Sequence, residues 1–447
     1  MPSLYLVAGL GKTGHSIARY LKRRNKAFVV FDTRVAPEGL SAFQAEFPGV
    51  DVFLEKIPQT LFGQLTEIIS SPGVSLDDPS IRQAVDLGIP VIGDIECLAR
   101  EVKVPIIAIT GTNGKSTVTT LVGEMAKAAG FSVAVAGNIG LPVLDLLDND
   151  ISYDLWVLEL SSFQLDLTYS LSPIAATILN VTSDHLDRHH SMDAYVKAKQ
   201  RIYHQAKTLV FNREDPFTTP HLSDTAITSH VSSFGLDAPH DRQWGVISKE
   251  GGTFLCYGQE HILSTEALRL KGRHNWQNAL ASCALADVVG VKWSTMVAVL
   301  EQFRGLPHRT EWVRTINGVD WINDSKGTNI GATISAISGI GGSMQGKIVL
   351  IAGGQGKGAD FTELQAPVAE YVRALVLIGE DADLLEKALG SVVQVKRASN
   401  LNDAVMIAKS NAEEGDVVLL SPACASLDMF RDFNHRGEVF TTSVIGL

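Results

Sequence analysis

Short apolar runs alternate with segments of helical periodicity along most of the chain. Ten such runs lie at residues 4–8, 27–32, 65–70, 104–110, 132–137, 154–160, 174–180, 347–354, 374–380 and 416–422. They lack polar alternation, which is typical of strands that are buried on both faces of a parallel sheet. Helical stretches between successive strands therefore predict an α/β fold that is repeated along the chain.

Two changes of pattern divide the chain into three expected domains. Residues 89–105 lead out of one β/α set into a strand with its own glycine-rich loop, which places a boundary near residue 94. Helical periodicity ends at RGLPHR (304–309), and a strand-like segment at 319–324 starts another set. We expect domains at 1–94, 95–305 and 306–447, each a mostly parallel sheet with flanking helices, since 447 residues is about three times the ~150-residue domain.

Composition excludes several classes of protein. Hydrophobic residues at 45% and charged residues at 19% argue against a disordered chain. A net charge of -11 without a local basic cluster predicts no nucleic-acid partner, because the run at 22–26 falls where the first helix should end. The four cysteines are too far apart for a metal pair, and no apolar run reaches membrane-spanning length, so we expect a cytoplasmic protein with free thiols and no membrane contact.

A glycine-rich loop follows the strand at 104–110 and precedes a helix. It comprises Gly111, Thr112, Asn113, Gly114, Lys115, Ser116 and Thr117. The glycines and the helix N-terminus would aim backbone N–H groups at a phosphate chain, Lys115 would supply positive charge, and a hydroxyl of Ser116 or Thr117 would serve magnesium. Ile109 stands where G-x-x-x-x-G-K-[ST] has its first glycine, yet strand, loop and helix together predict a P-loop-type central domain.

An earlier loop has the spacing G-x-G-x-x-G at Gly9, Gly11 and Gly14. It follows a strand and opens a helix, and Asp32 ends the next strand, near the offset of about 20 residues expected for a ribose-binding acid. These features fit a dinucleotide site in a Rossmann-like N-terminal domain. They fit a tight turn without a ligand equally well, because a lone G-x-G-x-x-G is a weak signal.

Other polar residues follow strands in the middle of the chain, where ligands of doubly wound sheets bind. Glu159 ends the run at 154–160 and is placed like an acid that holds magnesium or orients water. His185 follows the run at 174–180 and is a further candidate. His189 and His190 match no standard zinc spacing and are expected at the surface. Lys199 lies in a helical segment, where a lysine is solvated by default.

Three polar or glycine-rich loops follow strands of the last set, at 323–329, 353–357 and 421–426. Strands of one parallel sheet end at the same edge, so these loops are expected to lie together. Three such loops outline a binding face in a second Rossmann-like domain at the C-terminus.

With these motifs assembled, the sequence resembles the Mur ligase family, the ATP-dependent amide ligases of peptidoglycan precursor synthesis. The resemblance spans essentially the whole chain, in the family's order: GTNGKST (111–117), ELSSFQL (159–165), NVTSDHLDRH (180–189), KGRHNWQNALA (271–281), GLPHRTE (305–311), INDSKGTN (322–329) and SPACASLDMFRDF (421–433). The most similar members join D-glutamate to UDP-N-acetylmuramoyl-L-alanine. The resemblance implies that ATP converts the substrate carboxylate to an acyl phosphate, which the amine then attacks.

The resemblance also implies roles for individual residues. Lys115 would hold the γ-phosphate, Ser116 and Glu159 would bind one Mg²⁺, and His185 would bind a second. Lys199 matches the family lysine that CO₂ carbamylates to an anionic magnesium-binding group. This implied role replaces the expectation that the Lys199 side chain is solvated. Further ATP contacts are implied for the whole loop 111–117 and for Asn278, Arg309, Asp324 and Lys326.

For the UDP-linked substrate the resemblance replaces the dinucleotide interpretation of the first loop. The implied contacts are Gly11, Lys12, Thr13, Gly14, Asp32, Thr33, Arg34, Ser71 and Gly73, with Asn138 and His185 at the carboxyl end of the substrate. Lys12 stands where many relatives have an apolar residue, and it lies either near the pyrophosphate or in solvent. For D-glutamate the implied contacts are Thr328, Lys357, Ser426 and Phe433. A cation and a hydroxyl suit a diacid and reject neutral amino acids.

Three alternatives stay open on the sequence. A dinucleotide-dependent oxidoreductase would bind NAD and show no ATPase activity, and a nucleotide-gated binding module would respond to ATP without turnover. Folylpolyglutamate synthases use similar loops and glutamate, but they lack a separate N-terminal domain of this type. We expect a monomer whose domains close around the substrates.

Overall fold

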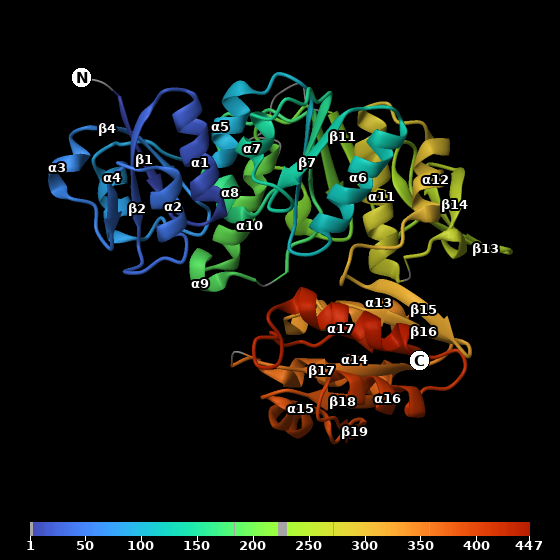
Figure 1. Cartoon of the computed structure of the whole chain (residues 1–447). Helices are drawn as coiled ribbons and strands as arrows, with labels where there is room; N and C mark the ends of the chain where they lie inside the picture. Colours follow the sequence, from blue (N-terminus) through green and yellow to red (C-terminus); the bar gives the residue numbers. More distant parts are fainter. Residues whose placement is uncertain (1–2, 183, 222–229, 271, 343, 357) are drawn as a thin grey trace. The chain divides into compact units, whose positions relative to one another are not determined.

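The computed structural model describes residues 3–182, 184–221, 230–270, 272–342, 344–356 and 358–447 (Figure 1). These residues form two compact units. The first comprises Met1–Gly235 and Ala281–Met296, and the second comprises Leu236–Leu280 and Val297–Leu447.

The first unit begins with a five-stranded sheet in which every strand is parallel to its neighbours, in the order β3-β2-β1-β4-β5 (Figure 1). The strands are β1 (Leu4–Ala8), β2 (Ala27–Asp32), β3 (Val52–Leu54), β4 (Leu65–Ser70) and β5 (Val91–Gly93), and the helices are α1 (Lys12–Arg23), α2 (Leu40–Glu46), α3 (Gln59–Phe62), α4 (Pro79–Asp86) and α5 (Asp94–Glu101). A Cβ atom on Gly14 would lie 1.8 Å from the carbonyl oxygen of Gly9. Helix α1 can therefore approach the end of β1 only because residue 14 has no side chain.

A second parallel sheet of the first unit carries the glycine-rich loop at 111–117. Within this unit its strand order is β11-β10-β9-β6-β8-β7. The elements are β6 (Ile106–Thr110), α6 (Lys115–Ala128), β7 (Val133–Gly137), α7 (Val143–Leu147), β8 (Leu155–Glu159), α8 (Ser162–Asp166), β9 (Ala175–Ile178), α9 (Leu186–His189), α10 (Met192–Gln200), β10 (Thr208–Asn212) and β11 (His230–Phe234), with 3₁₀ turns at Arg201–Tyr203 and Pro216–Thr218. Strand β6 lies between β8 and β9, so the loops that follow these three strands emerge side by side.

The second unit contains an antiparallel meander, β12 (Trp244–Lys249), β13 (Gly252–Tyr257) and β14 (Glu260–Ser264). It also contains a six-stranded sheet in the order β15-β16-β20-β17-β18-β19, parallel except for the pair β15–β16. Its strands are β15 (Glu311–Ile316), β16 (Val319–Asn323), β17 (Ile348–Gly353), β18 (Val372–Ile378), β19 (Gln394–Arg397) and β20 (Val417–Leu420). Helices of the chain from residue 273 onward are α11 (Arg273–Val288), α12 (Trp293–Gln302), α13 (Ile330–Gly341), α14 (Gln365–Tyr371), α15 (Ala382–Leu389), α16 (Leu401–Asn411) and α17 (Phe433–Ile445), and 3₁₀ turns lie at Thr265–Ala267 and Phe361–Leu364.

The expected α/β class is confirmed, because three mostly parallel sheets carry flanking helices and each of the ten apolar runs overlaps a strand. Residues on both faces of these strands are buried, as in Ile106, Ile107 and Ala108 of β6. The exact domain boundaries at 94 and 305 stay predictions.

The four cysteines, Cys97, Cys256, Cys283 and Cys424, are all free and buried. Burial raises the pKa of each thiol, to about 12 for Cys283 and Cys424. Among the residues that the structure describes, no helix combines the length and the apolar character that a membrane span requires.

Candidate functional site

The loop after β6 has a backbone that only glycine adopts readily at two positions. Gly111 has a φ of +151°, and a Cβ there would meet Cβ of Leu179 at 3.0 Å. Gly114 has a φ of +82° and forms the N-cap of α6, where no side chain caps the helix. Thr117 lies in the first turn of α6. The loop thus leads into the N-terminus of a helix, the arrangement that binds phosphate in P-loop proteins.

Two lysines converge on the carbonyl oxygen of Gly111. Nζ of Lys115 donates to it over 2.8 Å and to the carbonyl oxygen of Thr112 over 2.9 Å. Nζ of Lys199, from α10, donates to the same Gly111 oxygen over 2.9 Å. Lys199 is only 2% exposed, so the default expectation that its side chain is solvated is wrong. Burial and the charge of Lys115, against the attraction of Asp184, lower the pKa of Lys199 to about 6, and its amine is therefore largely neutral above neutral pH.

Glu159, at the end of β8, is held at both of its carboxylate oxygens. The Ser116 hydroxyl donates to Oε2 over 2.6 Å, and the Asn138 side-chain amide donates to Oε1 over 3.0 Å. The carboxylate is 2% exposed. Three predicted site residues from the ends of β6, β7 and β8 therefore meet at one buried carboxylate.

The segment after β9 packs against the same loop. Asn180 accepts a hydrogen bond from the backbone N–H of Asn113 over 2.8 Å and donates to its carbonyl oxygen over 3.1 Å. The hydroxyls of Thr112 and Tyr195 lie 3.2 Å apart. Asn180 and Tyr195 were not predicted as contacts, because nothing in their spacing distinguishes them from ordinary polar residues of a loop and a helix.

His185 is half-exposed and does not join Glu159 or Lys199 through a hydrogen bond among the described residues. It forms the N-cap of α9 with a φ of +53°, and its ring packs edge-to-face on Phe163 with 5.0 Å between centroids. Its neighbour His189 is 9% exposed and lies 2.9 Å from the Ser162 hydroxyl, so the expected surface position of His189 is wrong. His190 is exposed, as expected.

Two of the predicted UDP-substrate residues of the first loop, Gly11 and Lys12, border a groove of about 700 Å³. Its lining includes Gly11, Lys12 and Arg34, together with Gly140–Pro142 from the loop after β7. A Cβ on Gly11 would meet nothing within 4 Å, so the missing side chain leaves open space there. Lys12 and Thr33 are exposed, and Thr13 is half-buried in α1.

Asp32 organises one wall of this groove. It accepts hydrogen bonds from the backbone N–H of Leu10 (2.7 Å) and from the Arg34 backbone N–H and guanidinium, at 3.0 and 2.9 Å. Burial alone would raise the pKa of Asp32, but these hydrogen bonds outweigh it and lower the pKa. Asp32 is therefore a permanent anion that shapes the loop, and Arg34 keeps its charge at the rim.

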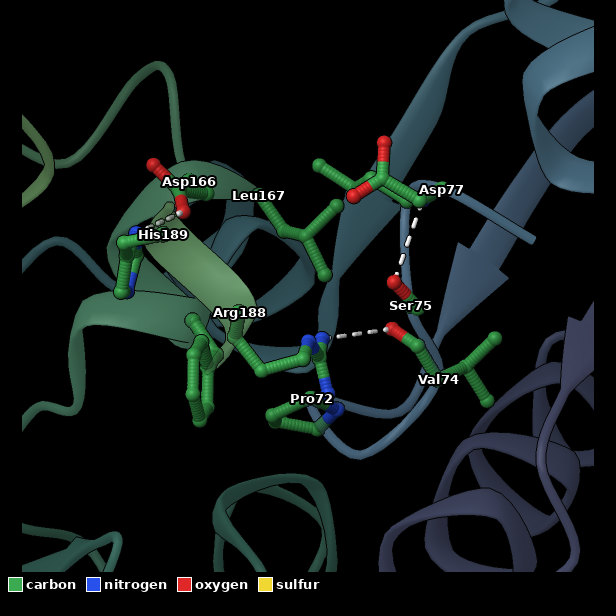
Figure 2. Close-up of a pocket in the computed structure, with 10 residues that line it drawn as sticks. Pro72, Val74, Ser75, Asp77, Asp166, Leu167, Arg188 and His189 are labelled. Atoms are coloured by element: carbon green, nitrogen blue, oxygen red, sulfur yellow. Dashed lines mark hydrogen bonds and ion pairs between the residues drawn. The ribbon is translucent and has the colours of Figure 1, made fainter. Parts of the chain in front are cut away.

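The loop at Ser71–Val74, after β4, is tied to the segment after β9 by Arg188. The guanidinium donates to the carbonyl oxygens of Gly73 (3.3 Å) and Val74 (3.4 Å), and its centre lies 4.6 Å from the ring centroid of Phe163. Figure 2 shows Arg188 extending across a small pocket toward Val74. Sequence reasoning missed Arg188, because an arginine between two histidines gives no sign of a partner 114 residues away.

In the second unit, Asp324 follows β16 and is buried. It accepts hydrogen bonds from the Ser421 hydroxyl (2.7 Å) and the backbone N–H of Thr310 (3.1 Å). Burial raises the pKa of Asp324 to about 6, against these hydrogen bonds and the nearby Arg309. Asn278, on α11, is 8% exposed, and its amide donates to Asn275 over 3.1 Å.

The three loops expected to form a binding face do lie together, because β16, β20 and β17 are neighbours in the sheet. Backbone hydrogen bonds join them, from Ala423 to Gly327 and in both directions between Gln355 and Ala425. Lys326 places its Nζ 5.0 Å from the centroid of Phe433, the first residue of α17. Thr328 is half-buried beside it, Ser426 is 5% exposed, and Lys357 lies outside the described residues.

The predicted ATP contacts thus fall into two groups, the loop 111–117 on the first unit and Asn278, Arg309, Asp324 and Lys326 on the second. Each group of residues belongs to a single unit. Within the described residues no three acids, histidines or cysteines cluster as a ready metal site. The buried carboxylate of Glu159 beside the Ser116 hydroxyl offers the oxygen donors that Mg²⁺ uses together with phosphate and water.

Three family descriptions match successive parts of the chain. "Mur ligase MurD-like, N-terminal domain" matches residues 3–93, "Mur ligase middle domain" matches 109–286, and "Mur ligase, glutamate ligase domain" matches 308–424.

Curated relatives extend this similarity over the full length. The chain is 67% identical to a UDP-N-acetylmuramoylalanine--D-glutamate ligase of Legionella pneumophila strain Philadelphia 1, over 100% of this chain and 99% of the relative. It is 48% identical to the protein of that name from Pseudomonas aeruginosa, over 98% and 97%. Among solved structures, the UDP-N-acetylmuramate-alanine ligase of Thermotoga maritima superposes with a TM-score of 0.56 at 18% identity, covering all of both chains. The last similarity supports the fold.

Proposed function

The chain belongs to the Mur ligase family of ATP-dependent ligases, and we propose that it joins D-glutamate to UDP-N-acetylmuramoyl-L-alanine in peptidoglycan precursor synthesis. The observation that carries the proposal is the buried Glu159 carboxylate, one hydrogen bond from Ser116 of the glycine-rich loop. That pairing suits a nucleotide triphosphate with its metal ion rather than a nicotinamide cofactor.

ATP would be bound through its phosphates at the N-terminus of α6. The uncapped backbone N–H groups of this helix and the Lys115 ammonium provide positive charge for the β- and γ-phosphates. Glu159 and Ser116 have the oxygen donors for Mg²⁺, which would neutralise phosphate oxygens when bound. Asn278, Arg309, Asp324 and Lys326 are the proposed contacts from the second unit.

Lys199 is proposed to act as a carbamate. Its amine is buried, hydrogen-bonded to Gly111, and next to the cation of Lys115. The neutral amine would form an N–C bond to CO₂ and release one proton to solvent. The anionic carbamate would be balanced by Lys115 and would give magnesium a second anionic ligand. His185 is proposed as a further ligand, and its ring packs edge-to-face on Phe163 in the structure.

The UDP-linked substrate is proposed to occupy the groove beside the first loop. Gly11–Gly14 would meet its pyrophosphate, Asp32–Arg34 would meet the uridine, and Ser71 and Gly73 would lie along the sugar. Asn138 would orient the carboxyl end while it holds Glu159. The open space at Gly11 and the positive charges of Lys12 and Arg34 support an anionic ligand there.

In the reaction, the substrate carboxylate attacks the γ-phosphorus of ATP, which gives an acyl phosphate and ADP. The amine of D-glutamate then attacks the acyl carbon, phosphate leaves from a tetrahedral intermediate, and the amine proton is released. Lys115 and the α6 N-terminus stabilise charge that develops on phosphoryl oxygens, so catalysis relies on positioning and electrostatics. Thr328, Lys357, Ser426 and Phe433 are the proposed contacts of D-glutamate.

The test is phosphate release with ATP, MgCl₂ and UDP-N-acetylmuramoyl-L-alanine, using D-glutamate, L-glutamate or meso-diaminopimelate as the amine. We expect turnover with D-glutamate alone. Turnover with another amino acid instead would overturn the specificity, and binding of NAD without ATP turnover would favour an oxidoreductase. A cytoplasmic monomer is the expected form, to be checked by cell fractionation and sedimentation.

A further inference from the structure

Arg436 is a fully buried cation at the base of the three-loop face in the second unit. It lies in the first turns of α17 and is 0% exposed. Nε donates to the Ser325 hydroxyl (3.0 Å), Nη2 to the Ser325 carbonyl oxygen (2.8 Å) and Nη1 to the Cys424 carbonyl oxygen (3.2 Å). Its hydrogen-bond partners are therefore neutral.

No carboxylate forms an ion pair with Arg436 in the part of the chain that the structure describes. The two nearby acids are engaged elsewhere, since Asp324 accepts from Ser421 and Asp428 accepts from the backbone N–H of Glu380. Burial lowers the pKa of Arg436 to about 10, so the guanidinium is still charged at neutral pH. By contrast Arg373, in the same sheet, pairs with the buried Asp416 at 2.7 Å.

Asp324 and Asp428 act on Arg436 electrostatically but do not hydrogen-bond to it, so its hydrogen bonds to the Ser325 and Cys424 groups fix its position. Arg436 hydrogen-bonds to both the loop after β16 and the loop after β20. These loops carry the proposed D-glutamate contacts Thr328 and Ser426. The Ser325 hydroxyl, which accepts a hydrogen bond from Arg436, also donates one to the carbonyl oxygen of Phe433 over 2.8 Å. One side chain thus links three segments of the proposed amino-acid site.

We propose that Arg436 is a positioning residue of the amino-acid site, which holds the loops of Thr328 and Ser426 in the arrangement that D-glutamate binds. The inference rests on the proposed function for the location of that site. Loss of the hydrogen bonds from Arg436 to Ser325 and Cys424 would therefore weaken binding of the amino acid more than binding of the other substrates.

The test compares R436Q, R436K and the control R373Q with the unmodified full-length protein. For R436Q we expect the KM for D-glutamate to rise at least about tenfold, while the KM values for ATP and the UDP-substrate stay within about twofold. R436K keeps the charge but not the three-way hydrogen bonding, so its KM for D-glutamate should rise about threefold. R373Q should lower the thermal midpoint without changing the KM for D-glutamate, because it removes the ion pair with the buried Asp416.

The outcomes separate this inference from the proposed function. An unmodified protein that does not use D-glutamate would refute the proposed function. Active unmodified protein with an unchanged KM for D-glutamate in R436K and R436Q would refute the role of Arg436 alone, as would a parallel rise of all three KM values. If R436Q does not fold, the selective rise in R436K decides the question.

Discussion

The hydroxyl of Ser116 donates a 2.6 Å hydrogen bond to Oε2 of Glu159, across 43 positions of sequence. This contact joins the glycine-rich loop after β6 to the end of β8. Because Asn138 occupies the other oxygen, the carboxylate has one orientation in the structure. A metal ion that binds there would replace or share a contact that already exists, so the site is largely preorganised.

The first prediction concerns Glu159. E159Q removes the negative charge but keeps the shape, and we expect kcat to fall at least about a hundredfold while the Mg²⁺ concentration for half-maximal rate rises. E124Q is the matched control, because Glu124 is exposed on α6 and pairs with the exposed Lys127. Steady-state phosphate release across a magnesium titration measures both kcat and the Mg²⁺ concentration for half-maximal rate. An unchanged magnesium requirement in E159Q would remove Glu159 from the metal site.

The second prediction concerns the backbone at Gly111. In G111A the new methyl group would meet Leu179 at 3.0 Å with a φ of +151°, so we expect a loss of ATP binding and a lower thermal midpoint. Gly130 also has a positive φ, +98°, but open space around it. G130A should therefore cost only about 1 kcal/mol of backbone strain and leave the KM for ATP unchanged. Equal effects of the two substitutions would contradict this explanation.

The third prediction concerns the Lys199 carbamate. K199A should lose most activity, and a short carboxylic acid should restore part of it by placing a carboxylate where the carbamate would stand. The unmodified protein equilibrated with ¹³C-bicarbonate should show a carbamate carbon resonance that K199A lacks. K197A, on the same helix, is the control and should keep both activity and resonance. A fully active K199A would exclude the role.

The fourth prediction concerns Arg188, which ties the Ser71–Val74 loop to the segment that carries His185. R188A leaves the carbonyl groups of Gly73 and Val74 without their donor, and the loop loses its fixed position. We expect the KM for the UDP-substrate to rise about tenfold with a smaller change in the KM for ATP. R82A removes an exposed arginine that bonds Asp77 nearby and should change neither value. A rise in the ATP KM alone would assign Arg188 to the other substrate.

The fifth prediction concerns stability and pH. Burial raises the pKa of Asp94 to about 6, above its value of 3.8 in an unfolded chain. The contribution of this group to the free energy of unfolding is therefore present below pH 3.8 and is lost as pH rises through about 6, at about 1.4 kcal/mol for each pKa unit. D94N should raise the thermal midpoint relative to unmodified protein more at pH 7.5 than at pH 4.5. D86N, an exposed control at the end of α4, should show no such difference between the two pH values.

Much of the fold could be predicted because parallel strands leave a strong trace in the sequence. Each of the ten apolar runs overlaps a strand. Short or polar strands were not predicted, because three or four residues are too few to show a hydrophobic period. These strands include β3 (Val52–Leu54), β5 (Val91–Gly93) and β19 (Gln394–Arg397). The parallel pairing of β11 was not predicted either, since it becomes visible only where β11 lies beside β10 in the sheet.

The site was predictable where backbone geometry demands particular residues. Gly14 and Gly111 appear in the glycine patterns because a side chain there would meet neighbouring atoms, and Gly114 appears because its φ is positive. Arg188 and Arg436 were not predictable, since Arg188 and two donors of Arg436 bond to groups more than 110 residues away, on other loops. Charge and spacing along the chain carry no information about such partners.

The buried thiols have a practical consequence for measuring motion. All four cysteines of the chain are free, buried and of raised pKa, so thiol-reactive dyes should label the folded protein poorly. A cysteine introduced at an exposed position on each unit would then react selectively, without first removing native residues. Distances between two such dyes, followed by energy transfer during turnover, would report directly whether the separation of the units changes as each substrate binds.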